Sequence, residues 1–275
     1  MTGPGGLASD RLGEGPPVVL VHGVGVGPWS YAAVAVDLAA DHQVVVAHRR
    51  GYGGSAGLTP AASLDEQVAD LVELAGGRAS FVGVSGGATV VLALALTAPE
   101  LVAAAVVHEP VIGALAPDLH AELRAAAARL GAQSGARASV AFVQGLVGEE
   151  TWAKLDADQR ADVARRGNVV RAEVPQFLAF SPTSAQLRSI AAVALVSSVG
   201  ARSRSSRHLA AAAVSACTRT SPIVLPDVGH LAQLDHPAAL ATAVRGAETL
   251  ALQRRPHGDH QVLAPGWGDH LEPHG

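Results

Sequence analysis

The sequence has little cysteine and no concentration of positive charge. Its single cysteine, Cys217, excludes an internal disulfide and a cluster of metal-binding thiolates, and it agrees with a reducing compartment. The formal net charge is −4 and no basic block is present, so the clustered Lys and Arg that bind phosphate are missing. We therefore expect a small-molecule partner and no nucleic acid, and we assign Cys217 to apolar packing.

Long apolar runs are also missing from the sequence. No run reaches the roughly 18 apolar residues of a membrane span, and residues 1–17 lack the continuous apolar stretch of a signal peptide. We therefore expect a soluble, cytoplasmic protein with no membrane partner. The chain of 275 residues is 49% hydrophobic and 16% charged, which is enough for one large core, with or without a modest insert. Oligomeric state is left open.

Short apolar runs bounded by glycine and proline alternate with stretches of helical spacing. Strands are predicted at 16–23, 42–48, 79–85, 101–110, 191–200 and 219–230, although alanine makes the run at 101–110 ambiguous with a helix. Helices are predicted at 28–40, 64–74, 86–98, 203–216 and 237–250. Apolar strands separated by helices indicate an α/β fold, with a mainly parallel central sheet covered by helices on both faces.

One long segment interrupts this alternation. Residues 113–190 show helical patterns and no strand signal, so we interpret them as a helical lid or cap inserted into a core formed by residues 1–112 and 191–253. Extra helices that only enlarge the core are the alternative. Residues 254–275 are rich in proline, glycine and histidine, and we predict a disordered tail there. Without a rigid frame, we expect no metal site from the tail histidines, which are His257, His260, His270 and His274.

The segment Gly83-Val84-Ser85-Gly86-Gly87 lies between a predicted strand and a predicted helix. A Gly-x-Ser-x-Gly motif in this context is typical of a nucleophile elbow, in which the glycines leave room for a serine with a strained backbone. A serine hydroxyl is a weak nucleophile and needs a neighbouring base. His230 is the best-placed candidate, because it follows the last apolar run and precedes a predicted helix.

Together these motifs resemble the α/β-hydrolase family over about residues 15–250. The resemblance is carried by the His22-Gly23 turn, "RRGYGGS" at 49–55, the elbow at Ser85 and the Gly229-His230 pair. It implies a lid after the strand that follows the elbow, an acyl-serine intermediate, and an oxyanion hole formed by the N–H groups of Val24 and Gly86. Trp29 and Trp152 are candidate pocket residues, with core packing as the alternative.

The position of the carboxylate that would orient His230, the acid of the catalytic triad, departs from the common pattern of this family. Many members carry an aspartate three residues after a glycine beyond the penultimate strand, and here that position is Ser203, with no carboxylate between Ile190 and Pro226. Some hydrolases of this fold place the acid one strand earlier, which corresponds to Glu109 in "VVHEP". We therefore assign Glu109 as the acid. The alternatives are a salt bridge from Glu109 to the lid, Asp227 or Asp235 as the acid, or no acid at all.

The predicted function is hydrolysis of an ester, thioester or lactone of a small, partly apolar substrate by Ser85, His230 and Glu109. No metal or organic cofactor is expected, because the sequence lacks metal-ligand spacing and a nucleotide-binding fingerprint. Two other classes stay open. One is a lyase-type or biosynthetic member of the fold, such as a carbon–carbon bond hydrolase, cyclase, decarboxylase or cofactor-free peroxidase, and the other is a non-catalytic ligand-binding protein.

Overall fold

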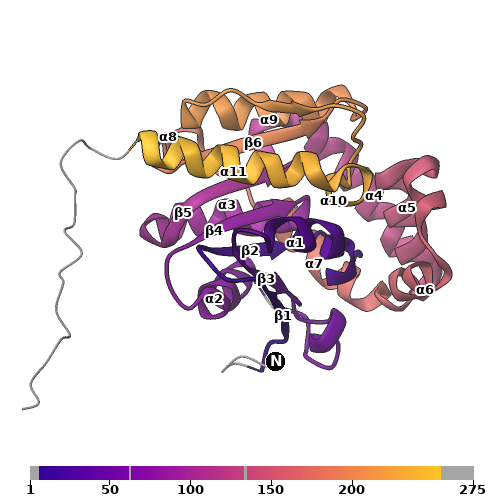
Figure 1. Cartoon of the computed structure of the whole chain (residues 1–275). Coiled ribbons are helices and arrows are strands. Elements are labelled where there is room, and N and C mark those ends of the chain that lie inside the picture. Colours follow the sequence, from indigo (N-terminus) through magenta and orange to yellow (C-terminus); the bar gives the residue numbers. More distant parts are fainter. Residues whose placement is uncertain (1–5, 62, 133–134, 255–275) are drawn as a thin grey trace, which may run out of the picture.

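A computed structural model describes residues 6–61, 63–132 and 135–254, which form a sheet with the strand order β1-β3-β2-β4-β5-β6-β7 (Figure 1). The strands are β1 (Ser9–Leu12), β2 (Pro17–Val21), β3 (Gln43–Ala47), β4 (Ala79–Val84), β5 (Val102–His108), β6 (Leu195–Gly200) and β7 (Ile223–Leu225). Strand β1 pairs antiparallel with β3, and every other neighbouring pair is parallel. The mainly parallel sheet predicted from the sequence is therefore confirmed.

Helices cover both faces of this sheet. The helices are α1 (Ala32–Leu38), α2 (Leu64–Ala75), α3 (Gly86–Thr97), α4 (Pro117–Ala132), α5 (Gly135–Lys154), α6 (Ala157–Arg165), α7 (Gly167–Ala179), α8 (Ser184–Ser189), α9 (Ser205–Thr218), α10 (Ala232–Asp235) and α11 (Pro237–Gln253). Short 3₁₀ turns are η1 (Pro28–Tyr31), η2 (Gly53–Ser55), η3 (Pro99–Leu101) and η4 (Gly113–Leu115). Buried residues of α2, α3 and α9 share one hydrophobic core, and those of α1 and α11 share the core on the other face.

The sequence pattern explains how the strands serve both cores. Along β2, Val19 and Val21 point into the core with α2 and α3, while Val18 and Leu20 point into the other. Successive side chains of a strand face opposite sides, so a strand buried on both faces is apolar throughout. The alanine-rich run at 101–110 forms β5 and not a helix, because it lies in the middle of the sheet between β4 and β6.

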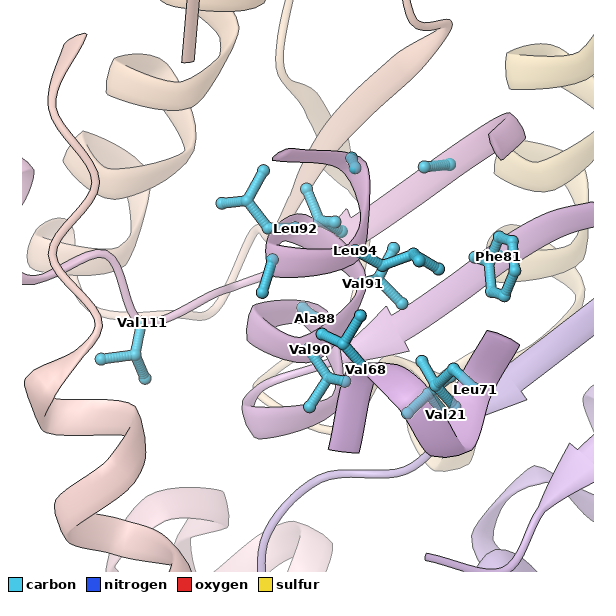
Figure 2. Packing of buried hydrophobic residues seen from close by; sticks show 14 of the residues in the cluster. Val21, Val68, Leu71, Phe81, Ala88, Val90, Val91, Leu92, Leu94 and Val111 are labelled. Carbon is cyan, nitrogen blue, oxygen red and sulfur yellow. The ribbon is translucent and has the colours of Figure 1, made fainter. Parts of the chain in front are cut away.

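Helix α3 is the most deeply embedded helix of the core. All its residues from Gly86 to Ala95 are buried, as expected for a helix that is apolar on every side. Figure 2 shows α3 with Val68 and Leu71 of α2 and Phe81 of β4 in the same cluster. Cys217 is a free, buried thiol in this cluster, in agreement with the packing role assigned to it.

Two features were not predicted. Strand β1 has the sequence SDRL, which lacks an apolar run, and it forms at the edge of the sheet through pairing with β3. The short helix α10 follows His230 directly. Between β5 and β6 the described chain contains helices and no strand, so the helical insert is confirmed. Figure 1 shows α4, α5 and α6 together at one end of the molecule.

Helix α11 continues to Gln253, and the predicted tail, with its four histidines, lies outside the described residues apart from Arg254. Within the described chain, none of the helices combines the length and apolar character that crossing a bilayer requires.

Candidate active site

Ser85 occupies a sharp turn between β4 and α3. Its φ is 57° and its ψ is −122°, an uncommon conformation for a residue with a side chain. The flanking glycines permit this turn, because a Cβ on Gly83 would lie 2.4 Å from the Gly87 carbonyl oxygen, and a Cβ on Gly87 would lie 2.1 Å from the Val21 carbonyl oxygen. The backbone geometry of a nucleophile elbow is therefore present at the predicted serine.

Glu109 and His230 meet at the same edge of the sheet as Ser85, although 121 positions separate them in the chain. Glu109 directly follows β5, and its Oε2 lies 2.7 Å from His230 Nδ1. Its φ is 52°, so Glu109, like Ser85, holds a strained backbone conformation at the end of a strand. Both side chains are buried. The structure thus brings together the acid and the base that the sequence predicted.

The Glu109 carboxylate accepts hydrogen bonds from three more groups. The Gly200 backbone N–H donates to Oε1 at 3.0 Å, and the hydroxyl of Ser203 donates to the same oxygen. Arg207 Nη1 lies 3.2 Å from Oε2. Despite its burial, the pKa of Glu109 is held well below its usual range by the hydrogen bond with His230 and by the nearby charges. Ser203, which lies where the resemblance would place the acid, therefore supports the Glu109 carboxylate.

His230 is neutral at physiological pH. Burial, aided by the positive charge of Arg207, lowers the pKa of its imidazole from 6.5 to about 4, against the opposing effect of Glu109. Among the described residues, neither His230 Nε2 nor Ser85 Oγ has a hydrogen-bond partner. Catalytic hydrogen bonds are often long or unformed in unliganded sites and tighten when substrate binds.

The other two carboxylates near His230 have separate roles. Asp235 accepts a hydrogen bond from the Gly229 N–H at 2.8 Å and one from the Thr151 hydroxyl at 3.0 Å, so it anchors the histidine loop. Asp227 is exposed to solvent and has a φ of 55°. In the described structure, neither carboxylate forms a hydrogen bond or ion pair with His230. Glu109 alone therefore meets the geometric requirement for the acid.

The backbone N–H groups of Val24 and Gly86 lie near Ser85. A Cβ on Gly86 would come within 2.9 Å of Val24 Cγ2, and a Cβ on Gly23 would come within 3.2 Å of Ser85 Cβ, so these segments are in close contact. Within the described chain, neither N–H group donates a backbone hydrogen bond. In this respect both meet one requirement of an oxyanion hole, whose donors must be free to bind the substrate oxygen.

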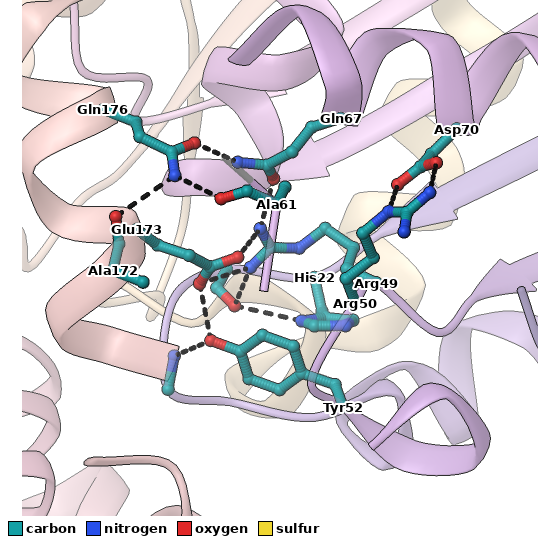
Figure 3. Close-up of polar contacts among 12 residues, drawn as sticks. His22, Arg49, Arg50, Tyr52, Ala61, Gln67, Asp70, Ala172, Glu173 and Gln176 are labelled. Carbon is teal, nitrogen blue, oxygen red and sulfur yellow. Dashed lines mark hydrogen bonds and ion pairs between the residues drawn. The ribbon is translucent and has the colours of Figure 1, made fainter. Parts of the chain in front are cut away.

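A buried polar cluster holds the loop that carries Val24 (Figure 3). Arg49 Nη2 donates to the Gly23 carbonyl at 3.0 Å, and the Gly25 N–H donates to the Tyr52 hydroxyl at 2.9 Å. Both side chains converge on Glu173 of α7, with Arg49 Nη1 at 2.6 Å and the Tyr52 hydroxyl at 2.7 Å from its oxygens. The loop on either side of Val24 is therefore fixed to the helical insert.

Sequence reasoning missed most of this cluster and the supporting residues of the acid. Arg49 and Tyr52 belong to the "RRGYGGS" segment, whose sequence pattern predicts a motif but no role for its side chains. Glu173 and Arg207 lie on helices and carry no local signal, since isolated charged residues on a helix usually face solvent. Here Glu173 is 1% exposed and Arg207 is 7% exposed.

Two cavities adjoin the site. A small one of about 30 Å³ is lined by Ser85, Val24, Gly86 and apolar side chains of α4, α5 and α7. A large one of about 380 Å³ is lined by His230, Ser203, Arg207 and residues of α4 and α5. Trp29 and Trp152 line neither of these two cavities, and the Trp29 indole donates a hydrogen bond to Asp162 at 3.0 Å. A substrate-binding role for the two tryptophans stays a prediction.

Comparisons with known proteins agree with the fold. A model described as "Alpha/beta hydrolase family" matches residues 18–243. A thermophilic esterase from Thermogutta terrifontis is similar in structure, with a TM-score of 0.75 and 21% identity over 91% of this chain and 97% of that one. The enol-lactonase from Burkholderia xenovorans has a TM-score of 0.71 and 16% identity over 90% of this chain and 99% of that one. At these identities the structures establish a shared fold.

A curated relative matches over a shorter range. The pimeloyl-[acyl-carrier protein] methyl ester esterase of Aliivibrio salmonicida is 34% identical over 90 residues, which cover 33% of this chain and 34% of that protein. The matched segment thus spans about a third of the length of this curated relative.

Proposed function

Because the chain belongs to the alpha/beta hydrolase family, we propose that it is a serine hydrolase that cleaves an ester, thioester or lactone through an acyl-Ser85 intermediate. The observation that carries this proposal is the contact of 2.7 Å between Glu109 and His230 at the edge of the sheet where Ser85 forms its elbow. Esterases and a lactonase among the proteins with the same fold support the choice of an acyl substrate.

In the proposed mechanism, Ser85 Oγ attacks the carbonyl carbon while His230 Nε2 accepts its proton. Glu109 holds the imidazole by Nδ1 and stabilises the imidazolium that forms. The N–H groups of Val24 and Gly86 receive the negative charge of the tetrahedral intermediate. His230 then protonates the leaving group, and a water molecule releases the acid from Ser85. The insert of residues 113–190 acts as a cap. Its helices α4 and α5 line both cavities, and its helix α7 lines the small cavity.

Labelling with a fluorophosphonate tests this function directly. The probe is expected to react with Ser85 in a ratio of about one per chain, because it needs a serine activated by a base. Peptide mapping by mass spectrometry would identify the labelled residue, and prior incubation with an activated ester should slow the labelling. A non-catalytic binding protein would remain unlabelled, and that result would refute the proposal.

The low pKa of His230 predicts an unusual pH profile. Only the neutral imidazole accepts the serine proton, so kcat/KM should be lost as the pH falls through the pKa of about 4, and not through 6.5. Arg207→Met removes a positive charge that lowers this pKa, and its acid midpoint should move to higher pH. Circular dichroism at each pH would separate titration from unfolding. A wild-type midpoint near 6.5, or an unchanged midpoint in Arg207→Met, would contradict this assignment.

The polar cluster predicts an effect on turnover from a residue outside the cavities. Glu173→Gln should weaken the ties to Arg49 and Tyr52, displace the loop of Val24 and lower kcat about 10- to 100-fold with little change in KM. The matched control is Asp70→Asn, which breaks the neighbouring Arg50–Asp70 ion pair shown in Figure 3 without touching that loop. Equal losses of kcat in the two variants, with equal losses of thermal stability, would indicate a structural role only.

A further inference from the structure

The two cavities divide the residues of the proposed mechanism between them. Ser85 and both proposed oxyanion donors line the small cavity, whereas His230 lines the large one. Three side chains of the insert, Leu123 of α4 and Phe142 and Leu146 of α5, line both cavities, so the cavities adjoin at these residues, which we call the wall.

The chemistry of acyl transfer assigns a part of the substrate to each cavity. The carbonyl carbon must bond to Ser85 Oγ with its oxygen at the N–H groups of Val24 and Gly86, so the acyl chain starts in the small cavity. The leaving oxygen or sulfur receives its proton from His230, so the alcohol or thiol portion extends on the His230 side. The wall residues then separate the acyl portion from the leaving group.

The small cavity accepts a short, apolar acyl chain. Its volume of about 30 Å³ holds about two water-sized groups. Around Ser85 it is lined by Val111, Val174, Phe177 and Leu178, together with the three wall residues. Apart from Ser85 and the two N–H donors, which the reacting carbonyl uses, this lining is apolar. Burying a further polar group there would remove its hydration without offering it a partner. Acetyl and propionyl groups fit this space, and long acyl chains do not.

The large cavity is more polar. Its volume is about 380 Å³, and its lining includes four arginines and three glutamates, which are Arg129, Arg202, Arg204, Arg207, Glu122, Glu149 and Glu150. Arg204 and Glu122 form an ion pair at 3.5 Å between side chains that are 71% and 38% exposed, and such exposed pairs are weak. Polar groups of a substrate could exchange for these partners, because both donors and acceptors are present.

Resting on the proposed serine hydrolase function, we propose that the preferred substrate is an ester or thioester of a short apolar acid with a large, polar alcohol or thiol. Acylation breaks the bond between the carbonyl carbon and the leaving oxygen or sulfur and forms the bond to Ser85 Oγ, and the proton of Ser85 passes through His230 to the leaving group. Water then attacks the acyl carbon and breaks its bond to Ser85 Oγ, while His230 takes a proton from the water and returns it to Ser85.

A series of 4-nitrophenyl esters with one leaving group and growing acyl chains tests the acyl side. The value of kcat/KM should be highest for acetyl or propionyl and at least about tenfold lower for octanoyl, because the small cavity has no room for the longer chain. Equal or higher values for octanoyl would overturn the proposal. If the enzyme hydrolyses these esters through Ser85 with no preference for short chains, the substrate class fails while the proposed function stands. Without hydrolysis and without fluorophosphonate labelling, both fail.

Removal of the wall should change this preference. Phe142→Ala is expected to raise the octanoyl-to-acetyl ratio of kcat/KM at least about tenfold by joining the two cavities. Leu146→Ala, which shortens a second wall residue, should shift the ratio in the same direction. The control is Phe180→Ala, a partly buried phenylalanine outside both cavities, which should leave the ratio unchanged. An unchanged ratio in both folded wall variants would overturn the assignment of the wall.

The leaving-group side needs a comparison at constant acyl group. Acetates of an oligo(ethylene glycol) and of an n-alkyl alcohol of equal chain length differ in polarity and not in reach. After division by the hydroxide-catalysed rate of each ester, kcat/KM should be at least about tenfold higher for the glycol ester. A preference for the alkyl ester would show that the large cavity does not select a polar leaving group.

Discussion

Replacement of Ser85 by alanine is expected to lower ester turnover on the order of 10⁶-fold and to abolish fluorophosphonate labelling. The methyl group cannot form the acyl-enzyme bond, and His230 then has no hydroxyl to activate. The remaining oxyanion donors would leave a residual rate about 10³ to 10⁴ above that of water. Stopped assays with a chromogenic acetyl ester would measure this residual rate.

Controls for the serine variant address folding and site identity. Ser189→Ala changes an exposed serine at the end of α8 and should keep full activity and labelling. The thermal unfolding midpoint of Ser85→Ala should lie close to that of the wild type, because the side chain has no hydrogen bond to lose within the described structure. Turnover above a tenth of the wild-type rate in folded Ser85→Ala would exclude Ser85 as the nucleophile.

Glu109→Gln should have the second largest effect, a loss of about 10⁴ in kcat. The carboxylate only accepts hydrogen bonds, and it accepts from His230 Nδ1, which sets the tautomer that leaves Nε2 free to take the serine proton. An amide at this position can present its NH₂ group to Nδ1 and favour the wrong tautomer. It also removes the negative charge that stabilises the imidazolium. Steady-state kinetics on an activated ester would measure the loss.

Ser203 provides the matched control for this variant. Its hydroxyl donates to Glu109, but Gly200, Arg207 and His230 still hold the carboxylate when it is removed, so Ser203→Ala should cost about tenfold or less. Ser203→Asp would place a second carboxylate beside Glu109 and should lower activity further through charge repulsion. Near-normal turnover in Glu109→Gln would contradict the assignment of the acid. So would a loss of turnover in Ser203→Ala that is larger than the loss in Glu109→Gln.

Local sequence determined the main outline of this protein. Each of the six predicted apolar runs contains a strand. The interior strands are buried on both faces and therefore need a mostly apolar run, whereas β7 at the edge of the sheet exposes Val224. Ser85, Glu109 and His230 follow such strands, and the carboxyl ends of parallel strands meet at one edge of a sheet. The approximate meeting place of the three residues could therefore be predicted, while their catalytic roles remain a proposal.

Tertiary structure decided the rest. The contacts of Glu109 with Ser203 and of Arg49 with Glu173 join residues 94 and 124 positions apart, and no local pattern in the sequence shows that these polar side chains meet. The lining that the two cavities share depends on how α4 and α5 pack against each other and against α7. The periodicity of apolar residues shows which face of a helix or strand is buried, but not which distant side chain contacts that face. For that reason, the residues that hold Glu109 and the arrangement of the two cavities became visible only in the folded chain.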